Sequence, residues 1–201
     1  MKIEEPDLTG TYTYADYLTW WWEERAELIK GTIYKMSPAP TSSHQLVAGE
    51  LYLQIGNYLK KKQCQVFIAP FDVRLPHTSR KENKDITTVV QPDLCVVCDR
   101  QKIDEKGCLG PPDWIIEILS KHTSAKDLTK KFDVYEQSGV KEYWVIDPIA
   151  ATVLIYTLDA SGKYKGLLKP FIRTDKISST VLPDLLIDLE EVFPLESTFL
   201  P

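Results

Sequence analysis

The spacing of apolar residues predicts two helices that each bury one face. Four residues recur every four positions in a helix predicted over residues 42–62: Val47, Leu51, Ile55 and Leu59. A second helix is predicted over residues 124–138. Ser124 and Asp127 have the spacing of a capping box at its start, and Gly139 lies at the C-cap position.

Runs of apolar residues predict a β-sheet between these helices. Residues 89–98 and 114–119 are almost continuously apolar, which is typical of central strands covered on both faces. A hairpin is predicted over residues 27–36 because Lys30-Gly31 can form a tight turn. The remaining predictions are strands at 66–75, 142–147, 152–158 and 163–168 and a short helix at 13–22.

This order of elements predicts one mixed α/β domain over residues 1–201, with its core at about 13–193. We expect a central mixed β-sheet flanked by helices, with an N-terminal hairpin and a C-terminal β extension.

The composition is that of an ordinary globular protein. Of its 201 residues 43% are hydrophobic and 26% are charged, which excludes a disordered or fibrous chain. The net charge of −5 excludes a globally basic nucleic-acid binder, so any phosphate contact must be local. No apolar run approaches the roughly 20 residues that span a bilayer, and we expect a cytoplasmic protein without a membrane partner. The four cysteines lack the spacing of a secreted disulfide framework, and we expect them to be reduced.

Two acidic residues interrupt segments that should be buried. Glu117 lies inside the run 114–119, and Asp93 directly precedes the apolar residues 94–97. On adjacent strands the two carboxylates would repel each other unless a cation lies between them, and oxygen ligands suit Mg²⁺ or Mn²⁺. The alternative explanations for these acids are a strand-end carboxylate that reaches solvent and a buried ion pair with Lys131.

Helical geometry predicts which polar side chains of the two helices point inward. At about 100° per residue, Lys131 falls among the apolar residues of the second helix, whereas Lys126 falls outside them. His44 shares the apolar face of the first helix, and Glu27 begins the hairpin. With the two strand acids, these residues predict a polar pocket. The alternatives are an exposed salt bridge between Asp127 and Lys131 and a purely structural, half-buried His44.

Several short segments occur in a recognisable order. They are AELIKGTIYKMSPAP at 26–40, VVQPDLCVV at 89–97, WIIEILS at 114–120, Asp127-x-x-x-Lys131-x-x-x-Tyr135, SGVKEYWVIDP at 138–148 and SSTVLPDLLIDLEEVF at 178–193. In order and spacing they resemble the Uma-two family of restriction-endonuclease-like proteins, which belongs to the PD-(D/E)xK nuclease superfamily. The resemblance implies a restriction-endonuclease-like core and a metal-dependent endodeoxyribonuclease that hydrolyses phosphodiester bonds with Mg²⁺.

The resemblance also implies roles for the unusual acids. Asp93 matches the aspartate of the PD half-motif and Glu117 matches the second acidic residue, so both would hold the metal. The lysine expected two residues later is replaced by Leu119. Its role therefore passes to Lys131, which matches the helical lysine of the family, with Lys121 as a competing candidate.

Other polar positions of the family are present as well. The resemblance gives catalytic roles to Glu27 and His44 and supporting positions to Asp127 and Tyr135. DNA is the expected partner, and the cations available to contact it are Arg80, Lys81, Lys84 and Lys121, together with Lys60, Lys61, Lys62 and Lys126.

Two other functions are compatible with the sequence. Because Leu119 replaces the usual lysine and the net charge is acidic, the chain could be a catalytically degenerate domain that binds nucleic acid or a protein partner. A purely structural oligomerisation module is the third hypothesis. The hairpin predicted over residues 152–168 could pair across a two-fold axis, and we expect a homodimer.

Overall fold

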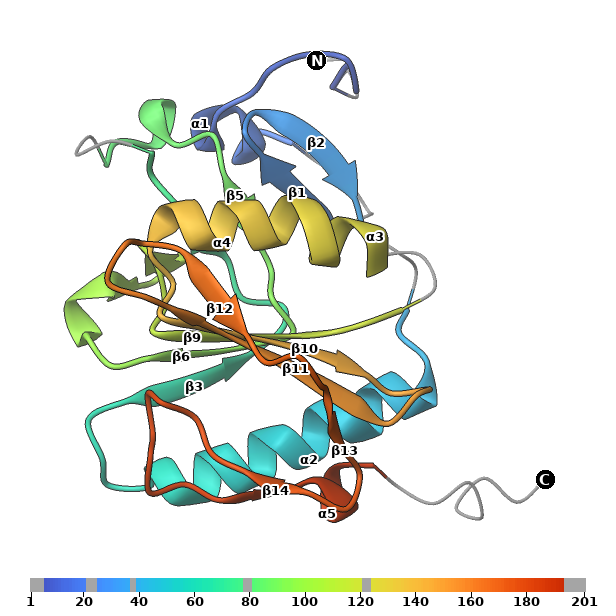
Figure 1. The fold of residues 1–201 in the computed structure, drawn as a ribbon. Helices are drawn as coiled ribbons and strands as arrows, with labels where there is room; N and C mark the ends of the chain where they lie inside the picture. Colours follow the sequence, from blue (N-terminus) through green and yellow to red (C-terminus); the bar gives the residue numbers. More distant parts are fainter. Residues whose placement is uncertain (1–5, 21–24, 37–38, 78–80, 121–123, 194–201) are drawn as a thin grey trace.

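The structure, a computed structural model, describes residues 6–20, 25–36, 39–77, 81–120 and 124–193 (Figure 1). Its centre is a seven-stranded sheet of β3 (Gln65–Ile68), β6 (Leu94–Val97), β9 (Trp114–Ile118), β10 (Glu142–Asp147), β11 (Thr152–Leu158), β12 (Tyr164–Gly166) and β13 (Phe171–Ile172). Six strands follow the order β12-β11-β10-β9-β6-β3, and β13 pairs with β11. β9 and β10 are parallel and the other pairs are antiparallel, so the predicted mixed α/β class is confirmed.

Helices cover both faces of this sheet. Figure 1 shows α2 (Ser42–Leu59) on one face and, on the other, the continuous helical segment made of α3 (Ser124–Lys126), the π-helical turn η3 (Asp127–Lys131) and α4 (Phe132–Ser138). Successive strand residues point to opposite faces, so Val96 packs in the cluster of α2 and Cys95 in the cluster of α4. The two predicted helices therefore sandwich the central strands.

A second, six-stranded sheet lies beside the first. Its strands are β1 (Ala26–Ile29), β2 (Thr32–Lys35), β4 (Val73–Arg74), β5 (Val89–Val90), β7 (Ile103–Asp104) and β8 (Gly107–Leu109). They follow the order β2-β1-β5-β4-β8-β7, and β1 and β2 form the predicted hairpin. Smaller elements are α1 (Tyr14–Tyr17), η1 (Asn83–Asp85), η2 (Arg100–Lys102), β14 (Lys176–Ile177), β15 (Ile187–Asp188) and α5 (Leu189–Val192).

Two predicted strands are wrong in the same way. The run 66–75 divides into β3 and β4, and the run 89–98 divides into β5 and β6. Each run contains a proline, Pro70 or Pro92, which has no N–H to donate to a ladder. At each proline the chain crosses from one sheet to the other, and Asp93 thereby comes to lie at the start of β6.

The predicted helix at 13–22 is also too long, because α1 spans only Tyr14–Tyr17 within the described residues. β12 is likewise shorter than the predicted strand 163–168. Gly139 ends α4 in the left-handed conformation with φ of 83°, as its position at the C-cap predicts.

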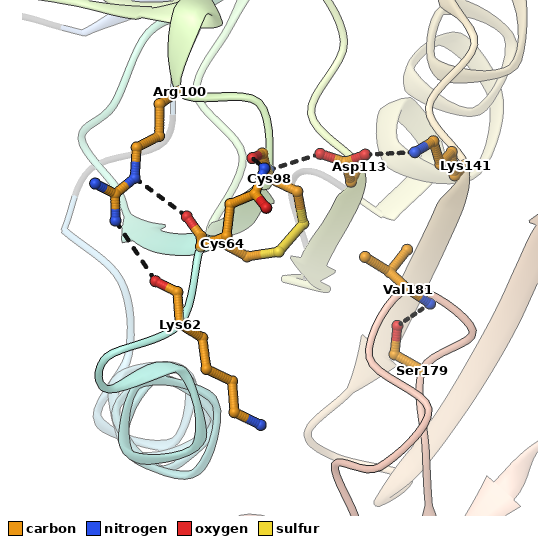
Figure 2. Close-up of a disulfide and its surroundings, with 9 residues drawn as sticks. Lys62, Cys64, Cys98, Arg100, Asp113, Lys141, Ser179 and Val181 are labelled. Carbon is orange, nitrogen blue, oxygen red and sulfur yellow. Dashed lines mark hydrogen bonds and ion pairs between the residues drawn. A yellow bond between two sulfur atoms is a disulfide. The ribbon is translucent and has the colours of Figure 1, made fainter.

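The expectation that all four cysteines are reduced is wrong for one pair. Cys64 and Cys98 form a disulfide, while Cys95 and Cys108 are free and buried (Figure 2). Gln65 pairs with Val97 in the β3–β6 ladder, so the two cysteines face each other one position beyond it. The pairing depends on this register across 34 residues, which the spacing of cysteines along the chain does not reveal. Among the described helices, none has the length and apolar character needed to cross a membrane.

Candidate active site

Asp93 and Glu117 lie opposite each other at the ends of two neighbouring strands. In the β6–β9 ladder Leu94 pairs with Ile116, which places Asp93 across from Glu117 one position further on. The N–H of Ile118 donates to Oδ2 of Asp93 at 2.7 Å. The structure therefore brings the two predicted metal ligands to one place in the sheet.

Lys131 points inward from the helical segment above these strands, as predicted. Its side chain is 4% exposed, and its Nζ lies 2.7 Å from Oε1 of Glu117 and 2.8 Å from Oε1 of Glu27. The Nζ is also 3.5 Å from Oδ1 of Asp127. The alternative of an exposed salt bridge between Asp127 and Lys131 is wrong, because both side chains are buried.

Glu27 is completely buried although it lies in the first hairpin. Its Oε1 accepts from the backbone N–H of Gln91 at 3.0 Å, and its Oε2 lies 2.5 Å from Nζ of Lys126. The hairpin thus contributes a carboxylate that two lysines from one helical segment share.

The contact of Lys126 with Glu27 departs from the helical-wheel prediction, which places Lys126 outside the inward sector. The cause is the π-helical turn from Asp127 to Lys131, since a π turn contains more residues than an α turn. The rotation per residue is smaller there, so Lys126, just before the turn, and Lys131, at its end, face the same way. Leu128 is correspondingly exposed.

His44 approaches from the opposite face of the sheet. It lies in the first turn of α2, which Thr41 caps by accepting the N–H of His44. Its Nε2 is 3.3 Å from Oδ2 of Asp93, while its buried Nδ1 has no hydrogen-bond partner among the described residues. His44 therefore contacts Asp93, one member of the acidic pair.

Tyr135 and Asp127 complete the group. The hydroxyl of Tyr135 donates to Oε1 of Glu117 at 2.6 Å, so this oxygen accepts from both Tyr135 and Lys131. The backbone carbonyl of Asp127 accepts from the hydroxyl of Tyr143 at 3.1 Å, which ties the π-helical turn to β10. Both predicted supporting residues thus contact the group.

A cavity of about 740 Å³ adjoins this group. Its polar wall includes His44, Gln91, Asp93, Glu117, Lys126, Asp127 and Lys131, and its apolar wall includes Met36, Pro70, Ile118, Leu119 and Pro148. Asp93 is 21% exposed and Lys126 is 14% exposed, whereas Glu117 and Lys131 are almost completely buried. Asp93 and Lys126 are therefore the more accessible members of the group.

Burial and charge act in opposite directions on the acids. Burial favours protonation of Glu27, but Lys131 and Lys126 outweigh it and lower the pKa of Glu27. At Glu117 burial prevails over Lys131 and, with the nearby charges of Asp127 and Asp93, raises the pKa to about 8. Lys131 stays charged because the surrounding carboxylates outweigh burial and raise its pKa. Without a further cation, Glu117 therefore holds a proton at neutral pH.

Burial and charge also act in opposite directions on the pKa of His44. Burial lowers its pKa, but the hydrogen bond to Asp93 and the charge of that carboxylate outweigh burial, so the pKa is raised. A histidine with this environment can be charged near neutral pH and can transfer a proton.

The residues present fit a hard divalent ion in one particular way. Within the described part of the chain, no group of three or more His, Cys, Asp and Glu side chains is placed to bind a metal. Asp93 and Glu117 remain as a pair of oxygen ligands, and Mg²⁺ is usually bound by one or two carboxylates together with water and substrate phosphates. The oxygen donors of this pair are therefore of the type that Mg²⁺ or Mn²⁺ prefers.

Among the described residues, the predicted nucleic-acid contacts other than Lys126 do not line the cavity. Lys81 is exposed and Lys84 pairs with Glu82 at the surface, and neither is among the described residues that line the cavity. Arg80 and Lys121 lie outside the described residues, so the choice between Lys131 and Lys121 rests on the placement of Lys131.

Sequence reasoning missed the inward contact of Lys126 with Glu27 and the position of Gln91 at the cavity. No periodicity reveals a π-helical turn, and a lysine beside a helix start has no distinctive pattern. Gln91 precedes the Pro-Asp pair, and this proximity to Asp93 was an available signal.

Comparison with known proteins agrees with this architecture. The sequence model of the Uma2 family, described as "Putative restriction endonuclease", matches residues 14–190. A curated "Uncharacterized protein slr1290" from Synechocystis sp. is 22% identical over 148 residues, which cover 71% of this chain and 73% of that protein. A crystal structure of a "putative nuclease" from Anabaena variabilis superposes with a TM-score of 0.68 at 22% identity, covering 90% of this chain and 97% of the other. The structural likeness supports the fold.

Proposed function

Since this chain belongs to the Uma2 family of restriction-endonuclease-like proteins, we propose that it is a Mg²⁺-dependent endonuclease that hydrolyses phosphodiester bonds of DNA. The observation that carries the proposal is the convergence of Asp93, Glu117 and Lys131 in one cavity. Two acids on adjacent strand ends and an inward lysine form a charged group that a stable core does not require. Family membership and the neighbouring fold support nuclease chemistry in general, and the metal, the residue roles and the choice of DNA are the proposed details.

Asp93 and Glu117 would hold the metal, and Mn²⁺ could replace Mg²⁺. Such an ion lowers the pKa of water and neutralises charge on the phosphate. Glu117 must lose its proton to bind it, and Lys131 at 2.7 Å stabilises the resulting carboxylate. Tyr135 orients the same carboxylate through its hydrogen bond.

The remaining residues serve proton transfer and positioning. His44 can accept or donate a proton at Nε2, where it lies against Asp93. Glu27 holds Lys131 and Lys126 in place from the hairpin side. Asp127 lies one helical turn from Lys131 and adds negative charge, which keeps that lysine protonated.

The test compares Asp93→Asn and Glu117→Gln with the wild type on plasmid and single-stranded DNA in Mg²⁺ or Mn²⁺. Each variant is expected to lower the cleavage rate by about 10²-fold or more, the scale of losing a group that stabilises transition-state charge. Glu190→Gln, at an exposed position of α5, is the matched control and should cleave like the wild type. Equal cleavage by all variants would indicate a contaminating nuclease and contradict the proposal.

A second candidate function is a catalytically degenerate domain that binds nucleic acid or a protein partner. It is favoured by Leu119 at the usual lysine position and by the lack of a three-ligand cluster among the described residues. Calorimetry with Mn²⁺ separates the two functions. Intact DNA binding without any Mn²⁺ binding would support the degenerate domain.

A homodimer and a cytoplasmic location are further parts of the proposal. The first rests on the hairpin of β11 and β12 at the edge of the central sheet. The second rests on composition and on the lack of an apolar segment long enough to cross a bilayer.

A further inference from the structure

Two lysines meet at Glu27, and they differ in what else surrounds them. Lys131 lies within 3.5 Å of three carboxylates, those of Glu27, Glu117 and Asp127. An ammonium group has three N–H donors. Lys131 therefore has an acidic neighbour for every donor and little capacity to bind a substrate.

Lys126 has a different environment. Its Nζ lies 2.5 Å from Oε2 of Glu27, which is its one ion-pair partner within the part of the chain that the structure describes. The side chain is 14% exposed and lines the cavity. One donor is engaged by a completely buried carboxylate, and no ion pair among the described residues uses the other two.

The acidic lining of the cavity favours a cation that faces the substrate. Asp93 and Asp127 line the cavity, and their carboxylates repel an anionic substrate. Among the described residues, the lysines and arginines of the lining are Arg25, Lys126 and Lys131. Arg25 is exposed and Lys131 is enclosed by acids, whereas Lys126 is both accessible and fixed by Glu27.

We propose that Lys126 is the lysine that contacts the phosphate of the substrate, and that Lys131 is a positioning residue that holds Glu27 and Glu117. This inference rests on the proposed nuclease function and assigns the substrate contact within the same cavity. The π-helical turn explains how both side chains reach Glu27 from one helical segment. Lys126 would stabilise charge on the phosphate oxygens as the bond to the leaving oxygen breaks.

The experiment compares Lys126→Gln, Lys126→Arg and Lys130→Gln on a DNA oligonucleotide in Mg²⁺. Lys130 lies on the same helical segment but donates to the hydroxyl of Tyr34 and does not line the cavity, so it is the matched control. Lys126→Gln should lower kcat by about 10²-fold or more, with Lys126→Arg restoring part of the rate and Lys130→Gln within about twofold of the wild type. Thermal unfolding of each variant verifies that the loss is not a loss of folded protein.

A binding measurement gives an independent readout. With Asp93→Asn as the background, affinity for the oligonucleotide is measured against salt concentration. Loss of one phosphate contact in Lys126→Gln should reduce the slope of log K against log salt by about one, and Lys130→Gln should leave it unchanged.

The outcomes separate this inference from the function on which it rests. If the wild type cleaves and Lys126→Gln matches Lys130→Gln in rate and salt slope, the assignment of Lys126 is overturned and the nuclease function stands. If the wild type neither cleaves nor binds DNA, both are overturned. A loss of kcat and of salt slope confined to Lys126→Gln supports the assignment.

Discussion

At the scale of single residues, the candidate site is a problem of charge balance. Glu27, Glu117 and Asp127 surround the ammonium of Lys131 inside the protein. Lys131 and Lys126 keep Glu27 ionised, whereas Glu117 keeps its proton because burial outweighs the one lysine that it shares. A divalent ion would change this balance by replacing that proton.

Stability without metal should therefore depend on Glu117. Its pKa is raised from 4.5 to about 8, so between these values the folded state binds more protons than the unfolded state. The free energy of unfolding then falls as pH rises from about 5 to about 8. Glu117→Gln mimics the protonated form and should remove a few kcal/mol of this fall, measured by urea unfolding in EDTA at several pH values.

His44 also lowers the free energy of unfolding as pH rises above 6.5, because its pKa is raised as well. This contribution of His44 should remain in Glu117→Gln. Glu190→Gln serves as the control and should keep the pH dependence of the wild type. Parallel curves for the wild type and Glu117→Gln would show that Glu117 titrates normally.

The residues of this site were only partly predictable. Asp93, Glu117 and Lys131 stand out because each is polar where the pattern requires an apolar side chain. Lys126 gave no such signal, since its inward position depends on the π-helical turn. The distances between these residues depend on strand register, which the sequence alone does not fix.

At the scale of elements, the spacing of apolar residues predicted correctly those helices and strands that belong to a single sheet or cover one of its faces. The helix α2 buries the apolar face that the four-residue spacing predicts, and β10 and β11 have the predicted bounds. The prediction of one continuous strand from each apolar run was wrong at residues 66–75 and 89–98. A continuous apolar run does not show that the chain changes sheets within it. The prolines in both runs were the signal for this change.

Glu142 joins β10 to the segment 179–181, and its loss should loosen that segment. The buried carboxylate accepts from Nε1 of Trp144 at 2.5 Å, from Oγ of Ser179 at 3.0 Å and from the N–H of Thr180 at 2.6 Å. Glu142→Gln replaces one accepting oxygen by an NH₂ group that faces these donors. The expected cost is about 2–4 kcal/mol in urea unfolding.

Hydrogen exchange locates the effect of this substitution. Amides at 179–181 should exchange faster in Glu142→Gln, while Glu191→Gln, an exposed position of α5, should leave them protected. Unchanged exchange at 179–181 would show that other contacts hold the segment.

The disulfide joins two strands at the end opposite the cavity. Asp93 precedes β6 and Cys98 follows it, so Cys64–Cys98 and the candidate site lie at different ends of this strand. Figure 2 shows Arg100 near the disulfide, where it donates to the backbone carbonyls of Lys62 and Gln63. The N–H of Cys98 donates to Asp113, which also pairs with Lys141.

Reduction of this disulfide should destabilise the protein with little effect on the cavity. Closure of a loop over 34 residues is worth about 3–4 kcal/mol in the chain-entropy account. Urea unfolding with and without dithiothreitol should differ by this amount. The double variant Cys64→Ser/Cys98→Ser should have the same free energy of unfolding as the reduced wild type, with or without dithiothreitol. If dithiothreitol does not change the free energy of unfolding of the wild type, the two thiols are unpaired in solution.

At the scale of the whole molecule, the cavity forms because elements from both faces of the sheet meet at the strand ends. His44 comes from α2 on one face and Lys131 from the helical segment on the other (Figure 1). Glu27 comes from the second sheet. The sequence predicted a polar residue on each element, but their meeting point is a property of the assembled fold.

The predicted homodimer would form through the edge of the central sheet. β12 is the terminal strand of the sheet order, and Leu167 and Leu168 directly after it are exposed. An edge strand with exposed apolar neighbours can pair with its copy across a two-fold axis. Light scattering should give twice the mass of one chain, and Leu167→Asp/Leu168→Asp should give a monomer. Leu186→Asp, at another exposed leucine, is the control and should stay dimeric.

This arrangement bears on how the proposed enzyme would cut DNA. Asp93 and Glu117 lie at β6 and β9 in the interior of the sheet order, so pairing through β12 would leave each cavity open. A two-fold dimer would present two such cavities, which suits cleavage of both strands of a duplex. If the wild type is monomeric at all concentrations, the dimer prediction is wrong and one cavity must act alone. Cleavage of a nicked plasmid into linear form by the wild type, but not by Leu167→Asp/Leu168→Asp, would connect the dimer to double-strand cutting.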